Sequence, residues 1–250
     1  MRDRIEIQRL ASNLRAKLGA DLYAPIDVFS LIASDSNLTV VFYPFDDQIS
    51  GICFKEAELI AINSKSTRGR QNFSLGHELY HYYIDNSEDS EISVIDTSKL
   101  EAKSSVEKEA DLFASHFLIP DQSLNKMVND LTNNLEKPLE LRNVIEIEQY
   151  FKVSRHALLS RLVMDKYMTL EYAETFRKDI IVNARRLGFD DSLYKPSPLG
   201  RNTQTIGAYI PRVTKLKNEG IISQGKYEEL LLDAFREDLV FGEDEDDNYD

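Results

Sequence analysis

The sequence is poor in residues that build covalent or cysteine-based frameworks. Its 250 residues include one cysteine, Cys53, and no tryptophan. A single cysteine excludes an internal disulfide and a cysteine-built zinc site within one chain. It also suits a reducing compartment, and we expect Cys53 to be a small core residue of a strand. With only four histidines present, a histidine-based site must draw on very few side chains.

Long apolar runs are absent as well. No stretch approaches the roughly 18 apolar residues that a transmembrane helix needs. The opening residues, MRDRIEIQRL, carry charges where a signal peptide has its apolar segment. We therefore expect a cytoplasmic protein with no membrane partner. Hydrophobic residues still make up 42% of the chain, which is enough to bury a core.

Positive charge is in deficit, with 30 Lys plus Arg against 43 Asp plus Glu and a net charge of −13. The last ten residues, FGEDEDDNYD, contribute −6, and the preceding 240 residues carry −7. We expect 241–250 to be a disordered acidic tail, because it has no apolar period. This balance excludes direct nucleic-acid binding through a general basic surface. It suits a basic protein partner instead.

The apolar spacing before residue 120 predicts a mixed α+β fold. Helices are expected over 3–18 and from Pro25. Short β-rich segments predict a small antiparallel sheet; they are Asn37–Phe42, Ile49–Phe54 and Glu58–Asn63. Two longer helices follow, over Arg70–Ile84 and Val106–Leu118, and Pro120 ends the second. The polar stretch 85–105 between them predicts a long loop with a short strand at Ile92–Ile95, and such loops often gate substrates.

Beyond Pro120 the chain is predicted to be helical. The expected helices are 121–130, 138–150, 154–166, 170–187, 203–219 and 223–237. Two prolines and a glycine between Tyr194 and Arg201 indicate a linker. We therefore divide the chain into a first domain over 1–168, a helical C-terminal region over 169–240 and the tail.

The most informative stretch is His77-Glu78-Leu79-Tyr80-His81, an H-E-x-x-H pattern. Each helical residue advances about 100°, so the two histidines lie one turn apart on one face and can reach a single metal ion. Glu78 lies beside that face, where it can take a proton from a water. The pattern is rare by chance in a chain with four histidines. It predicts a zinc-dependent hydrolase.

A catalytic zinc needs a third protein ligand and an open position for water. The helix predicted over Val106–Leu118 offers Glu107, which falls in its apolar stripe, where a carboxylate is costly unless paired or metal-bound. Glu109 and His116 fall off that stripe, and we expect both to face solvent. Glu107 is therefore our expected third ligand. Asp111 lies on the same face as Glu107 and is expected to accept the free ring N–H of a ligand histidine.

The donor that would stabilise the oxyanion of an amide-hydrolysis intermediate stays open. Four side chains are candidates, and the pattern favours none of them: Tyr82, Tyr83, His116 and Arg142. The tyrosines near the motif are expected to pack rather than act. His156, near the start of a helix, is expected on the surface.

With these motifs in hand, the chain resembles the ImmA/IrrE family of H-E-x-x-H, gluzincin-like metallopeptidases. RQNFSLGHEL at 70–79 is similar to the family's RQRFTLAHELGH segment, and EKEADLFA at 107–114, continued by LIP at 118–120, resembles ExxANxFAxxLLMP. VSRHALLSRL at 153–162 resembles a VSxxALxxRL helix. Pro25, Gly51 and Ile60–Asn63 also fit the family layout. The likeness covers roughly 5–166 and extends more loosely over 206–235.

The resemblance implies a zincin-like, mostly helical fold in which His77, His81 and Glu107 bind Zn²⁺ and Glu78 is the catalytic acid and base. Tyr80 stands where glycine is common and Asp111 where asparagine is common, and neither change removes a ligand. Family members typically cleave a helix-turn-helix repressor that controls a mobile element, a phage or a stress regulon. No helix-turn-helix domain precedes this one, so we expect the substrate to be a separate repressor protein.

Two other functions remain open at this stage. The acidic surface could mimic DNA, so a zinc-holding module could sequester a repressor without cutting it. A component of a toxin–antitoxin pair is the third alternative. The metal also stays open, because a site of two histidines and one glutamate accepts manganese, iron or cobalt.

Overall fold

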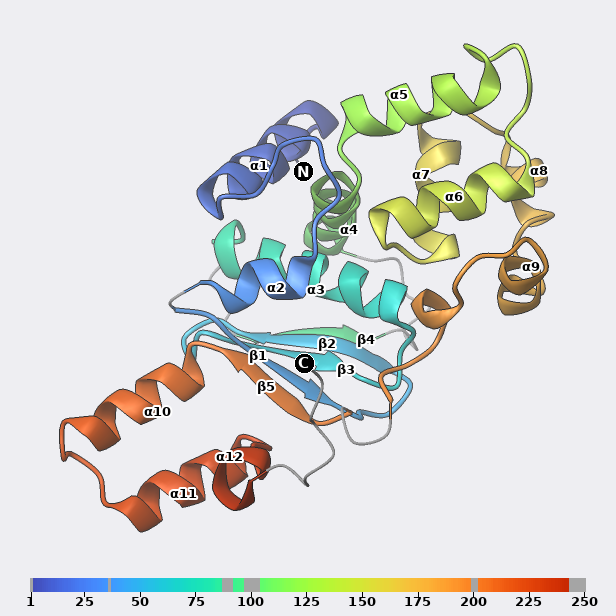
Figure 1. Cartoon of the computed structure of the whole chain (residues 1–250). Coiled ribbons are helices and arrows are strands. Elements are labelled where there is room, and N and C mark those ends of the chain that lie inside the picture. The colour runs from blue at the N-terminus through green and yellow to red at the C-terminus, as the bar shows by residue number, and fades with distance from the viewer. Residues whose placement is uncertain (1, 36, 87–91, 97–103, 199–201, 243–250) are drawn as a thin grey trace.

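The computed structural model describes residues 2–35, 37–86, 92–96, 104–198 and 202–242. It confirms the α+β class, with helices packed on a five-stranded sheet (Figure 1). The strands are β1 (Thr39–Tyr43), β2 (Ile49–Phe54), β3 (Leu59–Asn63), β4 (Ile92–Asp96) and β5 (Gln204–Gly207). Most of the expected gating loop, and residues 243–250 of the expected tail, lie outside the described residues. The division into domains stays a prediction.

The sheet is mixed rather than wholly antiparallel. Its strand order is β4-β2-β3-β1-β5, and β1 pairs with β3 in parallel while the other pairs are antiparallel. This arrangement arises because β2 forms its hairpin with β3, and β1 occupies the opposite edge of β3. Because β2 runs opposite to both β1 and β3, these two strands run in the same direction. The expectation of an all-antiparallel sheet was therefore wrong for one pair.

The edge strand β5 was not predicted, because residues 203–219 were expected to form one helix. Four residues pair with β1, and the helix begins only at Tyr209. A strand this short carries too few residues to show alternation. Its conformation is decided by its pairing with β1, which lies far earlier in the chain. Gly207 ends it with a positive φ of 88°, and a Cβ there would lie 2.3 Å from the Leu38 carbonyl oxygen.

The helices before residue 165 lie close to their predicted positions. They are α1 (Arg4–Lys17), α2 (Val28–Ala33), α3 (Arg68–Tyr83), α4 (Ser105–Leu118), α5 (Asp121–Thr132), α6 (Leu141–Phe151) and α7 (Arg155–Met164). The second helix starts at Val28 rather than Pro25, because the Asp27 side chain caps it by accepting from the Ser30 N–H. No helix among the described residues is both long enough and apolar enough to cross a bilayer.

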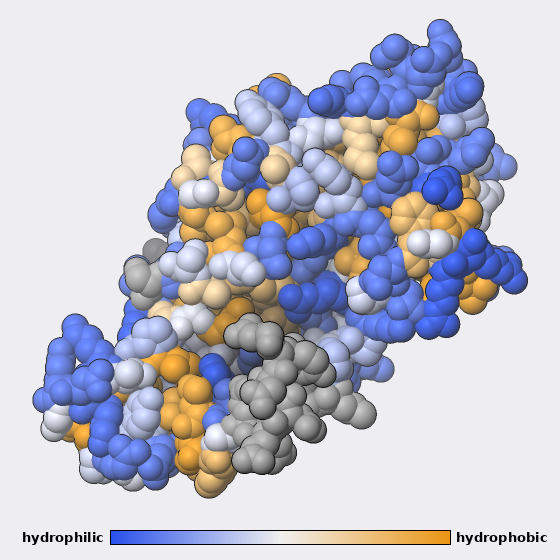
Figure 2. Space-filling model, viewed as in Figure 1, coloured by the Kyte–Doolittle hydropathy of each residue, from blue (hydrophilic) through white to orange (hydrophobic). Residues whose placement is uncertain are grey.

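The later helices are shorter than predicted. They are α8 (Leu170–Glu174), α9 (Ile180–Arg186), α10 (Tyr209–Asn218), α11 (Gln224–Asp233) and α12 (Asp238–Phe241), with a 3₁₀ turn, η1, at Ser192–Tyr194. The helix expected over 170–187 divides because Asp179 adopts a left-handed conformation, with φ of 52°. Figure 1 shows that α10–α12 project from the β5 edge of the sheet. Figure 2 shows apolar residues gathered at this end, where Phe241 is 77% exposed.

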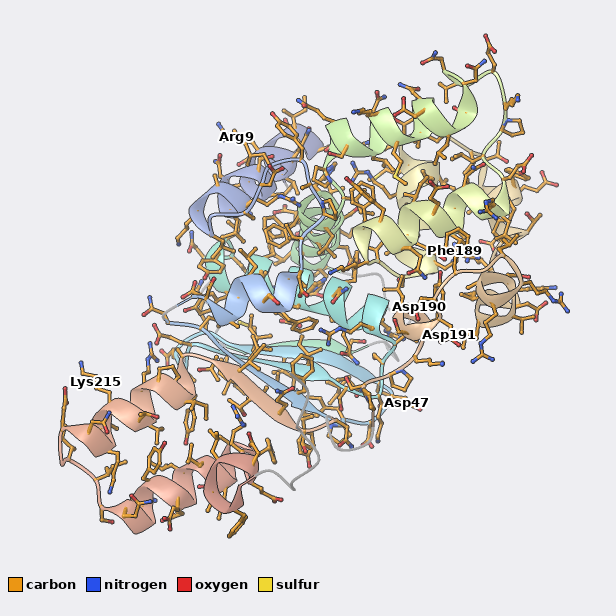
Figure 3. The ribbon with its side chains drawn as sticks, viewed as in Figure 1. Arg9, Asp47, Phe189, Asp190, Asp191 and Lys215 are labelled. Atoms are coloured by element: carbon orange, nitrogen blue, oxygen red, sulfur yellow. The ribbon has the colours of Figure 1, made fainter. Side chains whose placement is uncertain are left out.

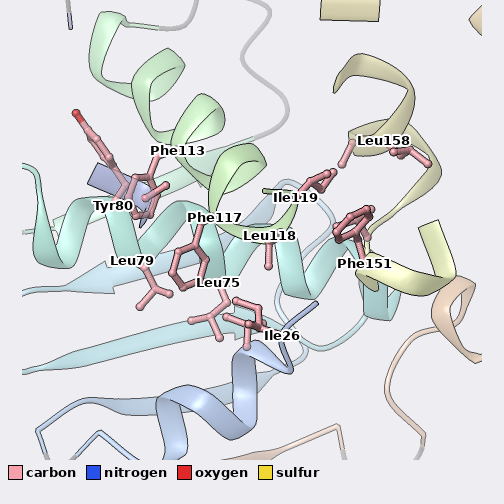
Figure 4. Packing of buried hydrophobic residues seen from close by; sticks show 14 of the residues in the cluster. Ile26, Leu75, Leu79, Tyr80, Phe113, Phe117, Leu118, Ile119, Phe151 and Leu158 are labelled. Atoms are coloured by element: carbon pink, nitrogen blue, oxygen red, sulfur yellow. The ribbon is translucent and has the colours of Figure 1, made fainter. Parts of the chain in front are cut away.

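Helix α3 is the centre of the packing. It lies on the sheet against β2 and β3, and α4 crosses it on the other side (Figure 1). The two helices approach closely because Gly76 faces Ala114: a Cβ at Gly76 would lie 3.3 Å from the Ala114 Cβ. Phe113 and Phe117 stack on α4, with ring centroids 5.7 Å apart, and fill the space beside Leu79 (Figure 4). Cys53 is buried in β2, as expected.

A buried ion pair joins α6 to α7. Arg155 donates to both oxygens of Glu148, over 2.6 and 2.7 Å, and both side chains are almost wholly buried. The Tyr194 hydroxyl also donates to Glu148, and Arg155 reaches the Phe176 carbonyl oxygen over 2.8 Å. One pair of charges therefore holds together α6, α7, the segment at Phe176 and the segment at Tyr194.

Removing one partner of this pair should be costly. We expect Arg155→Met to lower the free energy of unfolding by about 3–5 kcal/mol, because Glu148 would stay buried without its cation. Urea unfolding followed by circular dichroism measures the change. The control is Lys226→Met, which breaks an exposed pair with Glu229 and should cost less than about 1 kcal/mol. Equal losses in the two variants would contradict this account.

Candidate metal centre

Two histidines of α3 present their ring nitrogens to the same point. His77 and His81 are one helical turn apart, and both are buried between the sheet and α4. Their Nε2 atoms are 3.2 Å apart, and their ring centroids are 5.1 Å apart. The turn of helix predicted from the H-E-x-x-H spacing is thus present, and it places two soft nitrogen donors together.

Glu107 completes the group from the first turn of α4. Its Oε2 lies 3.2 Å from His77 Nε2, and its Oε1 lies 3.3 Å from His81 Nε2. The Ser104 hydroxyl caps α4 by accepting from the Glu107 N–H, which holds this first turn in place. Glu107 is half-buried, at the end of the buried stripe that runs along α4.

The spacing of these three side chains fits a tetrahedral metal ion. His77, His81 and Glu107 each offer one ligand atom, all within 4.8 Å of one another. Ligand atoms at about 2.0–2.2 Å from a tetrahedral ion lie roughly 3.3–3.6 Å apart. The two Nε2 atoms are 3.2 Å apart, close to that range, and the two Glu107 oxygens lie 3.2 Å from His77 Nε2 and 3.3 Å from His81 Nε2. The group can therefore hold a metal through two nitrogens and one carboxylate oxygen.

Each histidine is also held on its far side by a carboxylate. Asp111 Oδ1 is 3.0 Å from His77 Nδ1, and Asp85 Oδ2 is 3.2 Å from His81 Nδ1. When each Nδ1–H donates to its carboxylate, the neutral form of each ring keeps the lone pair of Nε2 for a metal ion. Asp85 was not predicted, although it follows His81 by four residues, as His81 follows His77.

Glu78 is wholly buried and points from α3 towards strand β2. A Cβ placed on Gly51 of β2 would lie 2.9 Å from Glu78 Oε1 and 3.1 Å from its Cγ. Only glycine leaves room for the carboxylate at this position. The strand and the helix therefore fix the position of the Glu78 carboxylate, one residue after His77 in α3.

Comparison with known proteins agrees with this geometry. Residues 33–163 match the family described as the IrrE N-terminal-like peptidase domain. The chain belongs to the ImmA/IrrE family. Among curated proteins, no sequence matches it significantly. The matched segment begins in α2 and ends in α7, so it contains α3, α4 and every residue of the group described above.

Membership of the ImmA/IrrE family supports a metallopeptidase-type function. The family resemblance drawn from the sequence is thereby confirmed, and a protease is the class of enzyme to which the chain belongs.

The carboxylates change the protonation of the group in the metal-free protein. Burial lowers the pKa of His77, but Asp111 and Glu107 outweigh it and raise that pKa to about 9. Burial raises the pKa of Glu107, and the two histidines outweigh it and hold that pKa well below its usual range. Charged His77 therefore stabilises the metal-free fold below about pH 6.5, and this contribution is lost as the pH rises through about 9.

Two predictions about α4 were wrong. Glu109 and His116 were expected to face solvent, yet both are buried, with 6% and 3% exposed. Glu109 accepts from the Tyr80 hydroxyl over 2.6 Å and from the Arg2 N–H over 2.7 Å, and His116 Nδ1 lies 2.8 Å from Asp121 Oδ2. The reason is that α4 packs against α1 as well as α3, so it is covered on two sides.

A cavity of about 730 Å³ borders the group, and His77 and Asp111 form part of its wall. The four candidate oxyanion donors, Tyr82, Tyr83, His116 and Arg142, are not among its described lining residues. Tyr83 donates to Asp35 instead, and Arg142 lies 5.4 Å from the Phe189 ring centroid. The basic side chains that do line the cavity are Arg70, Lys108, His156 and Arg161.

Metal binding should release protons from this group. At pH 7 most His77 rings carry a second proton in the metal-free protein, because their pKa is about 9, and a ligand imidazole must be neutral. We expect zinc binding to release about one proton from His77 at pH 7, and less as the pH rises through about 9. Isothermal titration calorimetry in buffers of different ionisation enthalpy measures the release.

The matched variant is Asp111→Asn, which lowers the pKa of His77 by removing a carboxylate partner. Its proton release at pH 8 should be smaller than that of the unmodified protein. A release that does not depend on pH, or that Asp111→Asn leaves unchanged, would show that His77 is not protonated before the metal binds.

Proposed function

We propose that this protein is a zinc-dependent endopeptidase, with His77, His81 and Glu107 as zinc ligands and Glu78 as the general acid and base. The observation that carries the proposal is the cluster of His77, His81 and Glu107, whose ligand atoms all lie within 4.8 Å of one another. Glu78, which follows His77 in α3, supplies a second carboxylate that is not one of these three ligands. Two histidines and one carboxylate with an open fourth position form a common catalytic zinc site.

A bound zinc supplies a water of near-neutral pKa and polarises the carbonyl of the scissile amide. Residues of the chain carry out the proton transfers and orient the ligands. Glu78 accepts the proton of the attacking water and returns it to the leaving amine. Asp111 and Asp85 keep the Nδ1 protons of His77 and His81 in place, so that both Nε2 atoms stay directed at the ligand site. Among divalent metals we favour zinc because of this donor set.

We further propose that the substrate is a helix-turn-helix repressor, whose cleavage relieves repression of a mobile element, a phage or a stress regulon. Family membership supports this substrate class, and the charge of the chain agrees with it. A net charge of −13 favours encounter with a basic, DNA-binding protein and disfavours contact with DNA itself. The proposal places the protein in the cytoplasm, where such a repressor acts.

One alternative draws support from the same charge. An acidic protein can occupy the DNA-binding surface of a repressor and sequester it without cutting it. Incubation with the repressor encoded by the adjacent gene separates the two functions. Loss of DNA binding together with repressor fragments supports the peptidase, and loss without fragments supports sequestration. Growth arrest on expression, removed by substituting His77, would instead indicate a toxin–antitoxin component.

The peptidase proposal depends most directly on Glu78. We expect Glu78→Gln to keep the metal, because none of the three ligands changes, and to lower the cleavage rate by at least about a hundredfold. Metal analysis and fragment formation measure the two effects. Glu171→Gln on the exposed side of α8 is the matched control and should cleave normally. A fully active Glu78→Gln enzyme would remove Glu78 from the mechanism.

The space that Gly51 leaves for Glu78 provides a second test. In Gly51→Ala the new methyl group would lie 2.9 Å from Glu78 Oε1, so the carboxylate must move. We expect the cleavage rate to fall at least about tenfold while zinc content is retained. Gly225→Ala is the control, since nothing lies within 4 Å of a Cβ at that position. Normal activity in Gly51→Ala would mean that the position of Glu78 is not critical.

A further inference from the structure

The cavity beside His77 continues into a second one. The first has a volume of about 730 Å³, and the second, of about 560 Å³, lies between the starts of α3 and α7 and helix α9. Arg70, Ser154 and His156 line both of them. A groove therefore runs from the candidate metal centre, past these three residues, to α9. Cavities of this size accommodate several residues of a peptide rather than one side chain.

The part of the groove nearest the metal centre is mainly apolar. Its walls come from three helices, with Phe73 from α3, Leu112 from α4, and Ala157 and Met164 from α7. These side chains are only partly covered by the rest of the chain, apart from Ala157. An apolar side chain of a bound peptide would cover them further, which is favourable in water.

Arg70 introduces a positive charge at the middle of the groove. It lies in the first turn of α3, its side chain is exposed, and its Nη2 donates to the Ser50 hydroxyl over 2.9 Å. Within the described part of the chain, no carboxylate lies within 4.0 Å of its guanidinium nitrogens. Four of its five N–H donors can therefore serve a ligand. An arginine held in this way is suited to a carboxylate.

The backbone brings Arg70 close to His156. Gly69 lies against the start of α7, where a Cβ would come within 2.7 Å of the Ser154 nitrogen. His156 is exposed, as expected, and its Nδ1 lies 2.5 Å from Arg177 Nη1. Because an arginine can only donate, Nδ1 must be the acceptor, and the ring proton is on Nε2. Although part of the side chain is exposed, partial desolvation of the ring, followed by the charges of Arg177 and Arg70, lowers the pKa of His156, so the ring is a neutral donor.

The acidic side chains that line the groove do not neutralise the positive charge of Arg70. Asp111 is directed at His77 Nδ1, and Asp179 lies at the far end, where α9 begins. Arg155 and Arg161 also line the groove, but they are bound to carboxylates of the chain. In a protein with a net charge of −13, the middle of this groove is thus locally cationic through Arg70.

We propose that the groove selects an acidic peptide segment: an apolar side chain lies against Phe73, Leu112 and Met164, and a following Asp or Glu pairs with Arg70 and His156. This inference rests on the proposed peptidase function and names the segment it accepts. It concerns the short stretch bound in the groove, whereas the basic character proposed for the repressor concerns its DNA-binding surface.

Binding tests the proposal without cleavage. The probe is a set of three labelled, end-capped peptide pools with a fixed central Leu and, at the next two positions, Glu, Gln or Lys. Zinc-loaded Glu78→Gln protein keeps the peptides intact, and fluorescence anisotropy gives their affinities. We expect the Glu pool to bind on the order of fivefold more tightly than the Gln pool and the Lys pool most weakly, with the differences shrinking at high salt.

Substitution at Arg70 should change this order. Arg70→Gln should remove the preference for Glu, and Arg70→Glu should reverse it towards Lys. Arg9→Glu is the matched control, because Arg9 is exposed on α1, far from the groove, and carries the same change of charge (Figure 3). It should keep the original order. Thermal unfolding and zinc content check that each variant is folded and loaded.

The inference is overturned if the three pools bind equally, or if Arg70→Glu and Arg9→Glu shift the preferences alike. The latter result would indicate a general effect of net charge. Failure of the peptidase function has a different signature. If the pools bind selectively to Glu78→Gln but the unmodified enzyme never cuts them, the proposed selectivity of the groove stands and the proposed peptidase activity is wrong.

Discussion

The close approach of α3 and α4 is the constraint on which the candidate metal centre depends. The two histidines belong to one helix and Glu107 to the other, so their separations of 3.2–3.3 Å exist only because the helices nearly touch. Gly76 and Ala114 allow this contact, and Phe113 and Phe117 fill the remaining space. The chemistry of the site is therefore determined by small residues that take no part in it.

Several polar groups around this contact are partly or wholly buried and are hydrogen-bonded to one another. Asp111 and Asp85 orient the histidines, and Tyr80 and Arg2 bind Glu109 on the opposite side of α4. Buried polar groups that are fully bonded make a core rigid and specific, whereas unbonded ones destabilise it. A metal ligand set held by such a network keeps its shape before a metal arrives, which reduces the ordering that metal binding must achieve.

Local periodicity was enough to predict the helices that build the site. The spacing of His77 and His81 and the position of Glu107 in the stripe of α4 depend only on the geometry of one helix each. Errors arose where distant segments decide the outcome. Glu109 and His116 are buried because α1 covers a second side of α4, and β5 forms because β1 lies beside it. The parallel pairing of β1 with β3 likewise depends on which edge β1 occupies.

The pairing of β5 with β1 has a consequence for the limits of the catalytic unit. The family match ends at residue 163, yet the sheet beneath α3 is completed by residues 204–207. The 3₁₀ turn η1 also packs on α3, and the Arg68 N–H donates to the Lys195 carbonyl oxygen. A chain cut at the end of the family match would leave β1 with an open edge, ready to pair with another molecule. Segments beyond the family match thus protect one edge of the sheet and support the helix that carries both histidines.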